Sequence, residues 1–257
     1  MKIGIFQPDI KNYHSLEQKL SQLKKILISN SSLDVLVLPE LFLSSYSSND
    51  QITQYSSEDI QVFEQSILSL SSEHQCSIIY GYPEIKNDKR YNSALATNLD
   101  NTVLYNHRKT LLAPNTMEQE LFLPGKGFDT FLLGDIKCSV LICYEFEFPE
   151  IVRKISQMGA QIVFIPTALG VDFEFVANEM LKTRAFENQI ILVYANYCGN
   201  SHDHNFLGKS AIVNEKGQDL LRFVDKEDFL AVDVEFKDQK TRRDRLPYLK
   251  DLSKVEV

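Results

Sequence analysis

Two kinds of hydrophobic pattern alternate along this sequence, and their order limits the fold more than any other feature. Short apolar, β-branched runs predict buried strands, and apolar residues recurring every three or four positions predict amphipathic helices. The order strand, helix, strand, helix and then a block of strands occurs twice in the 257 residues. We therefore predict an α/β fold with two facing sheets and helices on their outer faces, a four-layer α-β-β-α sandwich.

The predicted elements follow one another without a flexible linker. Helices are expected at 16–27, 57–70, 150–158 and 172–188. Strands are expected at 2–6, 34–38, 77–81, 91–98, 102–105, 129–133, 137–142, 161–166, 190–196, 209–213, 220–224 and 230–234. A long connection at 109–127, a polar loop at 198–205 and a charged tail at 237–257 complete the chain. We expect one domain over 1–257, with 237–257 as a C-terminal tail that has no clear core face.

The composition is that of a globular protein with an acidic surface. Hydrophobic residues make up 44% and charged residues 24%, which is enough apolar material for a full core. The formal net charge of -8 argues against nucleic acid or an anionic membrane as a partner. No apolar run approaches the roughly 20 residues that span a bilayer, and no secretory signal pattern is present. The four cysteines form no CxxC pair, so we expect a cytoplasmic protein with reduced thiols.

The stretch 139–150 carries the first chemical signal. An apolar run predicts a buried strand, Cys143 follows at its carboxyl end, and Pro149 suits the first turn of a helix. Open α/β sheets place reacting groups at this end of their strands, and a nearby helix N-terminus favours thiolate over thiol. A lone cysteine after a strand is also often a small buried hydrophobe, so its surroundings decide the interpretation.

Three charged residues also stand where predicted elements end. Glu40 closes a strand, Lys109 follows the hairpin, and Glu118 lies in the long connection. A thiol nucleophile needs a base within reach, and a developing oxyanion needs positive charge or aimed N–H groups. A carboxylate, an ammonium and a thiol together meet both needs, although each charge alone would also suit a solvated position.

Several segments, in order along the chain, resemble the carbon–nitrogen hydrolase (nitrilase) superfamily. They are LPELF at 38–42, YNHRK at 105–109, EQELFLPG at 118–125, CYEFEFPE at 143–150, PTA at 166–168, RAFEN at 184–188 and GKS at 208–210. The resemblance implies the four-layer sandwich and a triad of Glu40, Lys109 and Cys143. It also implies a second glutamate at Glu118, with Glu120 as the rival, and a homodimer or larger homo-oligomer.

The resemblance further implies a reaction, the hydrolysis of a non-peptide carbon–nitrogen bond in a small linear amide. Glu40 would accept the Cys143 proton, while Lys109 and the backbone N–H of Tyr144 would hold the oxyanion. The resulting thioester on Cys143 would be hydrolysed to a carboxylate. We expect no metal or organic cofactor in this chemistry.

Substrate contacts are expected near the carboxyl ends of the strands. The candidate substrate-binding residues are Tyr46, Tyr144, Glu145, Ala168 and Leu169. Many family members carry Asp where Glu145 stands and Arg where Glu147 stands, and these departures leave the acyl group open. Tyr144 stands where nitrilases usually have Trp and favours amide hydrolysis. N-carbamoyl amine hydrolysis and nitrile hydrolysis are the alternatives within the family.

Three other interpretations compete with the triad. His107, two residues from Lys109, is a candidate base for Cys–His catalysis. A weak cluster in the polar loop has metal-ligand chemistry and consists of Cys198, His202, Asp203 and His204. A non-enzymatic, family-related binding scaffold would leave Cys143 unreactive.

Overall fold

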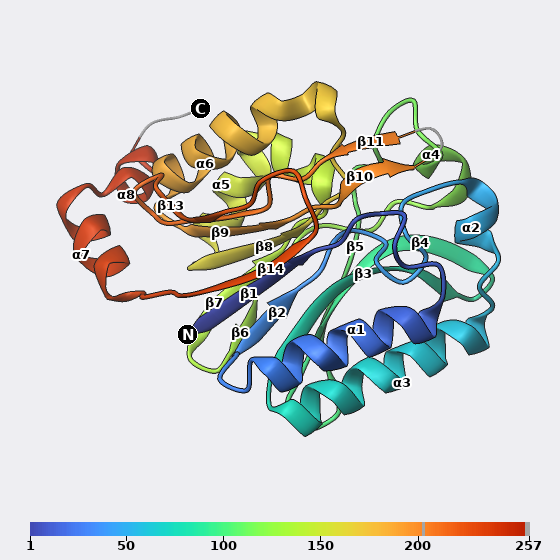
Figure 1. Cartoon of the computed structure of the whole chain (residues 1–257). Helices are drawn as coiled ribbons and strands as arrows, with labels where there is room; N and C mark the ends of the chain where they lie inside the picture. Colours follow the sequence, from blue (N-terminus) through green and yellow to red (C-terminus); the bar gives the residue numbers. More distant parts are fainter. Residues whose placement is uncertain (202–203, 255–257) are drawn as a thin grey trace.

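The structure contains two six-stranded sheets that face each other, with helices on their outer faces (Figure 1). The computed structural model describes residues 1–201 and 204–254. One sheet has the strand order β14-β1-β2-β3-β4-β5 and the other has the order β13-β12-β9-β8-β7-β6. The four layers are those of the α-β-β-α sandwich that the sequence predicts.

The first sheet has a parallel centre and antiparallel edges. Its strands are β1 (Lys2–Gln7), β2 (Val35–Val37), β3 (Ser77–Lys86), β4 (Lys89–Thr97), β5 (Val103–Arg108) and β14 (Asp228–Asp233). Helices α1 (Leu16–Ser29) and α3 (Ser57–His74) cover its outer face. Both helices begin with a capping box, at Ser15 and Ser56, in which side chains and backbone N–H groups bond reciprocally.

The second sheet is built in the same way and carries the strand that leads to Cys143. Its strands are β6 (Phe131–Leu133), β7 (Ile136–Val140), β8 (Ile162–Pro166), β9 (Ile191–Ala195), β12 (Ala211–Val213) and β13 (Asp219–Arg222). Helices α5 (Pro149–Gln157) and α6 (Leu181–Asn188) pack on its outer face. Pro149 occupies the first turn of α5. A backbone N–H at that position has no acceptor within the helix, so proline, which lacks the N–H, loses no hydrogen bond there.

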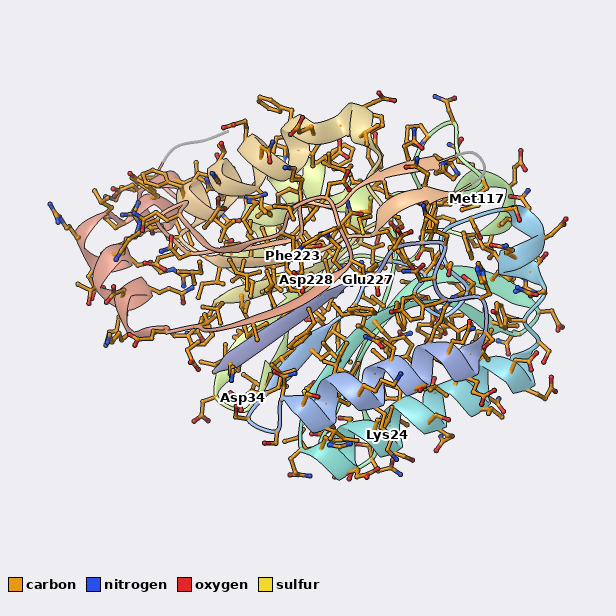
Figure 2. All side chains as sticks on the ribbon, in the orientation of Figure 1. Lys24, Asp34, Met117, Phe223, Glu227 and Asp228 are labelled. Atoms are coloured by element: carbon orange, nitrogen blue, oxygen red, sulfur yellow. The ribbon has the colours of Figure 1, made fainter. Side chains whose placement is uncertain are left out.

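Side-chain alternation along the strands fills the space between the sheets (Figure 2). On β2, Val35 and Val37 point into the central core, while Leu36 packs against the helices outside. On β8, Ile162 and Phe164 point inward in the same way. Because successive strand residues face opposite sides, strands covered on both faces read as continuous apolar runs. Each such fully buried side chain contributes about 2 kcal/mol of hydrophobic stabilisation.

Three predicted segments differ in the structure. The helix expected over 172–188 is divided into a 3-10 turn η2 (Val171–Phe173), a π-helical turn η3 (Val176–Met180) and α6. The expected polar loop forms a hairpin of β10 (Cys198–Ser201) and β11 (His204–Leu207). The tail contains two helices, α7 (Lys237–Arg245) and α8 (Tyr248–Leu252).

Polar contacts hold the tail against the second sheet. Gln239 Nε2 donates to the carbonyl oxygen of Gln161 at 2.6 Å, and an Arg243 amino group donates to that of Ala160 at 3.1 Å. Polar contacts of this kind produce no periodic pattern of apolar residues in the sequence. For this reason the sequence indicated no core-facing side for the tail. Within the described residues, no helix combines the length and apolar character needed to cross a membrane.

Candidate active site

Three of the predicted residues form one buried cluster, in which an ammonium group lies between two carboxylates. Lys109, just beyond β5, places its Nζ 2.7 Å from Oε1 of Glu40 and 2.7 Å from Oε1 of Glu118. Glu40 follows β2, and Glu118 begins the short helix α4 (Glu118–Leu121). All three side chains are completely buried. Residues separated by up to 78 positions in the sequence therefore form one charged cluster where strands end.

The two carboxylates keep Lys109 positively charged. Burial alone would lower the pKa of Lys109, but Glu40 and Glu118 outweigh it and hold that pKa well above its usual range. A buried charge of this kind is stable only while its partners remain. The cluster therefore presents a fixed cation, which is the group that a developing oxyanion requires.

Glu40 has one engaged oxygen and one free oxygen. Its Oε1 accepts from Asn92 Nδ2 at 2.7 Å and from Lys109 Nζ. Its Oε2 is buried and has no hydrogen-bond partner among the described residues. Burial raises the pKa of Glu40 to about 7, although Lys109 opposes the change. A carboxylate with a free oxygen and a pKa near neutrality is suited to accept and return a proton.

Glu118 is held from both sides. Its Oε1 accepts the Tyr46 hydroxyl at 2.9 Å as well as Lys109 Nζ, and its Oε2 accepts the N–H of Ala113 at 3.1 Å. These bonds use both carboxylate oxygens. Glu118 is therefore arranged to orient Lys109, and Glu120 makes no comparable contact with Lys109.

Cys143 lies on a strained turn that follows β7. It begins the 3-10 turn η1 (Cys143–Glu147) with a φ of +47°, a conformation uncommon for a residue with a side chain. Strain of this kind costs about 1 kcal/mol or more and concentrates at functional sites. The sulfur is close enough to Glu40, Lys109 and Glu118 for their charges to act on it.

The Cys143 sulfur is held as a thiol. Burial raises its pKa well above the ordinary value, Glu40 raises it further, and Lys109 counteracts both only in part. At this site burial and the nearby Glu40 carboxylate dominate, so the net shift favours the thiol over the thiolate. A base is needed to remove the proton as the sulfur attacks.

Glu145 supports the cysteine turn from behind. Its carboxylate accepts the backbone N–H of Ile142 at 2.8 Å and that of Thr110, and it lies 2.8 Å from Nε2 of His107. Glu145 is completely buried and does not line the cavity beside Cys143. The expectation that Glu145 contacts substrate is therefore corrected, because its oxygens are used by the backbone N–H groups of Ile142 and Thr110 and by His107.

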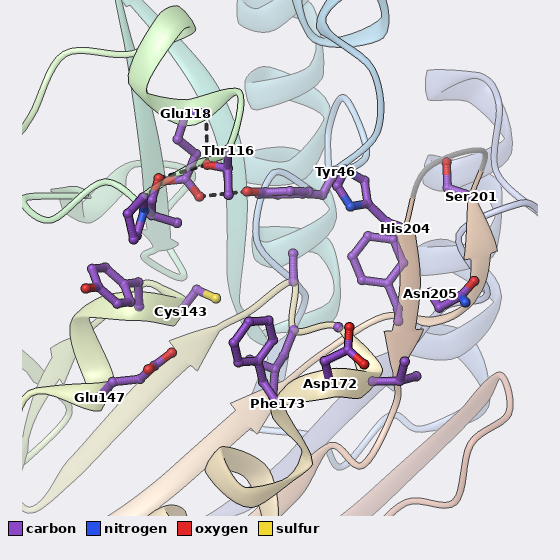
Figure 3. A pocket seen from close by; sticks show the side chains of 18 residues that line it. Tyr46, Thr116, Glu118, Cys143, Glu147, Asp172, Phe173, Ser201, His204 and Asn205 are labelled. Carbon is purple, nitrogen blue, oxygen red and sulfur yellow. Dashed lines mark hydrogen bonds between the residues drawn. The ribbon is translucent and has the colours of Figure 1, made fainter.

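A cavity of about 550 Å³ opens over Cys143 (Figure 3). Four of the five predicted substrate contacts line it, namely Tyr46, Tyr144, Ala168 and Leu169. Further lining residues include Thr116, Glu147, Asp172, Phe173, Asn205 and Phe206. The sequence marked Glu147 only as a departure from the family pattern, and no local pattern marked the others, because they come from loops and from the β10–β11 hairpin. The cavity is large enough for a small organic molecule.

Among the described residues, the competing interpretations find less support than the triad. His107 pairs with Glu145 and lines a separate cavity with Phe128, away from the one that contains Cys143. Cys198 is buried and His204 lines the Cys143 cavity, while His202 and Asp203 lie outside the described residues. Across 1–201 and 204–254, no group of three or more His, Cys, Asp or Glu side chains could hold a metal ion.

Comparison with known proteins decides the family. A family model described as carbon-nitrogen hydrolase matches residues 2–241. The chain belongs to the carbon–nitrogen hydrolase family. The resemblance seen in the sequence is thereby confirmed.

Two similar proteins align with most of this chain. A protein named "Hydrolase in pqqF 5'region" from Pseudomonas protegens is 34% identical over 77% of this chain and 70% of its own length. An (R)-stereoselective amidase from Pseudomonas sp. is 29% identical over 98% of this chain and 91% of its own length.

A solved structure of the family confirms the predicted fold. A glutamate-to-glutamine mutant of the amidase from Nesterenkonia sp. AN1 matches with a TM-score of 0.87 and 28% identity. The match covers 98% of this chain and 93% of that one. In that mutant, the acetamide moiety of fluoroacetamide is covalently added at the active site cysteine.

In this carbon–nitrogen hydrolase, three residues that sequence reasoning missed position Glu40. Asn92 donates to its carboxylate, as described above. Lys19 Nζ donates to the carbonyl oxygens of Phe42 and Leu43, just after Glu40, at 2.8 and 2.7 Å. Gly81 lies so close that an added Cβ would be 2.2 Å from the backbone nitrogen of Leu41. All three contacts join distant parts of the chain, so no local sequence pattern predicts them.

Proposed function

We propose that this protein hydrolyses a small linear amide to a carboxylate and ammonia through a thioester on Cys143. The observation that carries the proposal is the buried Glu40–Lys109–Glu118 cluster beside a cavity that contains Cys143. The two amidases described above support amides as the substrate class. The triad roles and the substrate contacts are part of this proposal.

In the first half-reaction, the sulfur of Cys143 attacks the amide carbonyl carbon. Oε2 of Glu40 takes the thiol proton as the carbon–sulfur bond forms. The oxyanion of the tetrahedral intermediate is held by the Lys109 ammonium and the backbone N–H of Tyr144. Losing one such donor typically costs about 3 kcal/mol, or a hundredfold or more in rate.

The intermediate then collapses with loss of ammonia. Glu40 returns the proton to the amide nitrogen as the carbon–nitrogen bond breaks, and an acyl thioester remains on Cys143. In the second half-reaction, Glu40 takes a proton from water, and the resulting hydroxide attacks the thioester carbon. The carbon–sulfur bond breaks, the carboxylic acid leaves, and the proton on Glu40 returns to the Cys143 sulfur.

Ammonia release across a substrate panel tests the proposal. We expect turnover of amides and little or none of nitriles and N-carbamoyl amines, which are the alternative substrate classes. Cys143→Ala should abolish ammonia release, and Glu40→Gln should lower it by about 10²- to 10⁴-fold. The buried Cys138, outside the cavity, is the matched control, and Cys138→Ser should retain activity in folded protein.

Some outcomes would contradict the proposal. Activity confined to nitriles would overturn the amide assignment. Turnover that survives in Cys143→Ala would overturn the nucleophile. Absence of turnover throughout the panel, together with a Cys143 that does not react with acyl probes, would favour the non-enzymatic scaffold.

We also propose a cytoplasmic homodimer or larger homo-oligomer, built as a single domain. Several large aromatic side chains are exposed, among them Phe173, Phe175 and Phe186. Exposed apolar side chains of this size favour association with another surface. All four cysteines are free thiols, which suits a reducing compartment. The acidic net charge of -8 makes nucleic acid and anionic membranes poor partners.

A further inference from the structure

One carboxylate in the cavity has no part in the proposed mechanism. Glu147 ends the same turn that Cys143 begins, and both side chains face the cavity (Figure 3). Glu147 is only partly exposed, and its carboxylate has no hydrogen bond or ion pair with any described residue. Arg184 approaches it but donates to the Glu147 backbone oxygen, at 3.2 Å, and not to the carboxylate.

This carboxylate belongs to the same short turn as Cys143. Burial raises the pKa of Glu147, and the charge of Lys109 opposes that rise. A partly buried carboxylate without a partner carries a desolvation cost. A bound cation would offset that cost, whereas a bound anion would increase it.

The rest of the cavity adds negative charge. Asp172 lines the same cavity, and its carboxylate also has no hydrogen bond or ion pair with a described residue. Among the described lining residues there is no Lys or Arg. Lys109 is not among the described lining residues, and its charge is paired with the carboxylates of Glu40 and Glu118. His204 is the one described lining group that can become positive by protonation.

An apolar wall stands beside these carboxylates. It is formed by Ala168, Leu169, Phe173 and Phe206. An alkyl chain can lie against this wall while the amide carbon is held at Cys143. The cavity thus combines a place for a short hydrocarbon chain with uncompensated negative charge.

We propose that the preferred substrate is a linear amide whose acyl chain carries a protonated amine, with Glu147 as the main determinant of that preference. This inference rests on the proposed amide hydrolysis for the identity of the reaction. Glu147 and Asp172 attract the ammonium group and repel acyl chains that end in a carboxylate.

Three amides of matched shape test the proposal. They are 4-aminobutyramide, which is cationic, pentanamide, which is neutral, and the monoamide of glutaric acid, which is anionic. We expect kcat/KM for the cationic amide to exceed that for the neutral one about tenfold, with the anionic amide lowest.

Glu147→Gln removes the charge and keeps the shape of the side chain. It should lower kcat/KM for the cationic amide about tenfold more than kcat/KM for the neutral amide. The matched control is Glu150→Gln, because Glu150 is exposed on α5 and does not line the cavity. If Glu147→Gln does not fold, Asp172→Asn at the exposed mouth should reduce the same preference about threefold.

A binding measurement separates this inference from the proposed reaction. Calorimetric titration of the Cys143→Ala protein with the three amides requires no turnover and should give the same order of affinity. If the wild-type protein hydrolyses none of them while this order is kept, the reaction is wrong and the cation preference stands. Equal or reversed preference in both assays, or a preference unchanged in Glu147→Gln, would overturn the inference.

Discussion

At the scale of single residues, the protonation state of Glu40 sets when the site can work. Burial raises its pKa to about 7 against the opposing effect of Lys109. Below that pH, Glu40 is protonated and cannot accept the Cys143 proton. Above it, the carboxylate is ionised and can act as the base, so activity should rise with pH through this region.

The pH dependence of kcat/KM for an amide substrate gives the first prediction. We expect a rise centred near pH 7, and a loss of about 10²- to 10⁴-fold at all pH values in Glu40→Gln. His107→Ala should keep the same ascending limb, because His107 lies outside the cavity. Loss of turnover in His107→Ala together with a mild effect of Glu40→Gln would instead support Cys–His catalysis.

The sequence and its family resemblance identified the charged residues of the site, and the structure brings them together. Each of the three residues Glu40, Lys109 and Cys143 stands where a predicted element ends, and the sequence around each one resembles the family pattern. Asn92 has neither feature, because its contact with Glu40 depends on how β2 and β4 lie in the sheet. Glu145 was predicted as a substrate contact because it lies near Cys143 in the chain, but it points behind the turn.

At the scale of elements, helix α1 holds the segment that carries Glu40. Lys19 is completely buried and donates to Phe42 O, Leu43 O and Ser45 Oγ at 2.7 to 2.9 Å. Leu41 and Ser45 both have a positive φ, so this segment depends on such contacts to keep its shape.

Lys19→Met gives the second prediction. It leaves three buried acceptors without their donor and should lower the free energy of unfolding by about 2–4 kcal/mol. Urea denaturation measures this loss. Lys24 on the same helix is exposed, so Lys24→Met should change stability by less than about 0.5 kcal/mol. Equal effects of the two substitutions would show that the buried contacts do not hold the segment.

Strand β3 supports the same segment from the other side and gives the third prediction. A Cβ at Gly81 would lie 2.2 Å from Leu41 N and 2.7 Å from Glu40 Cα, so Gly81→Ala must displace Glu40. We expect kcat to fall at least about tenfold. Gly134→Ala is the control, because a Cβ there meets open space, and its positive φ should affect only stability. Full activity in Gly81→Ala would contradict the requirement for close packing.

Sequence patterns predicted the helices and strands that have an apolar side. They did not predict the elements that consist mainly of polar residues. The strands β2 and β8 are continuous apolar runs and were found. The β10–β11 hairpin was taken for a loop because backbone pairing, such as Gly199 with Phe206, holds its polar residues in strands. The helix at 172–188 was predicted unbroken because single 3-10 and π-helical turns are local changes in backbone hydrogen bonding that the spacing of apolar residues does not reveal.

At the scale of the whole molecule, the exposed aromatic side chains give the fourth prediction, which concerns assembly. Phe173 is 58% exposed and Phe175 is 68% exposed, values unusual for such large apolar side chains. Burying these side chains against a second copy would remove their apolar surface from water. Light scattering should therefore report a mass at least twice the 29.5 kDa of one chain. A monomer at micromolar concentration would contradict this prediction.

The account as a whole depends on a covalent bond between the substrate acyl group and Cys143. The most direct test is mass spectrometry of the protein quenched in acid during turnover of an amide, followed by peptide mapping. We predict an added acyl mass on the peptide that contains Cys143, and none on Cys76, Cys138 or Cys198, which are buried. Steady ammonia release with no acyl mass on Cys143, or release that persists in Cys143→Ala, would contradict the account.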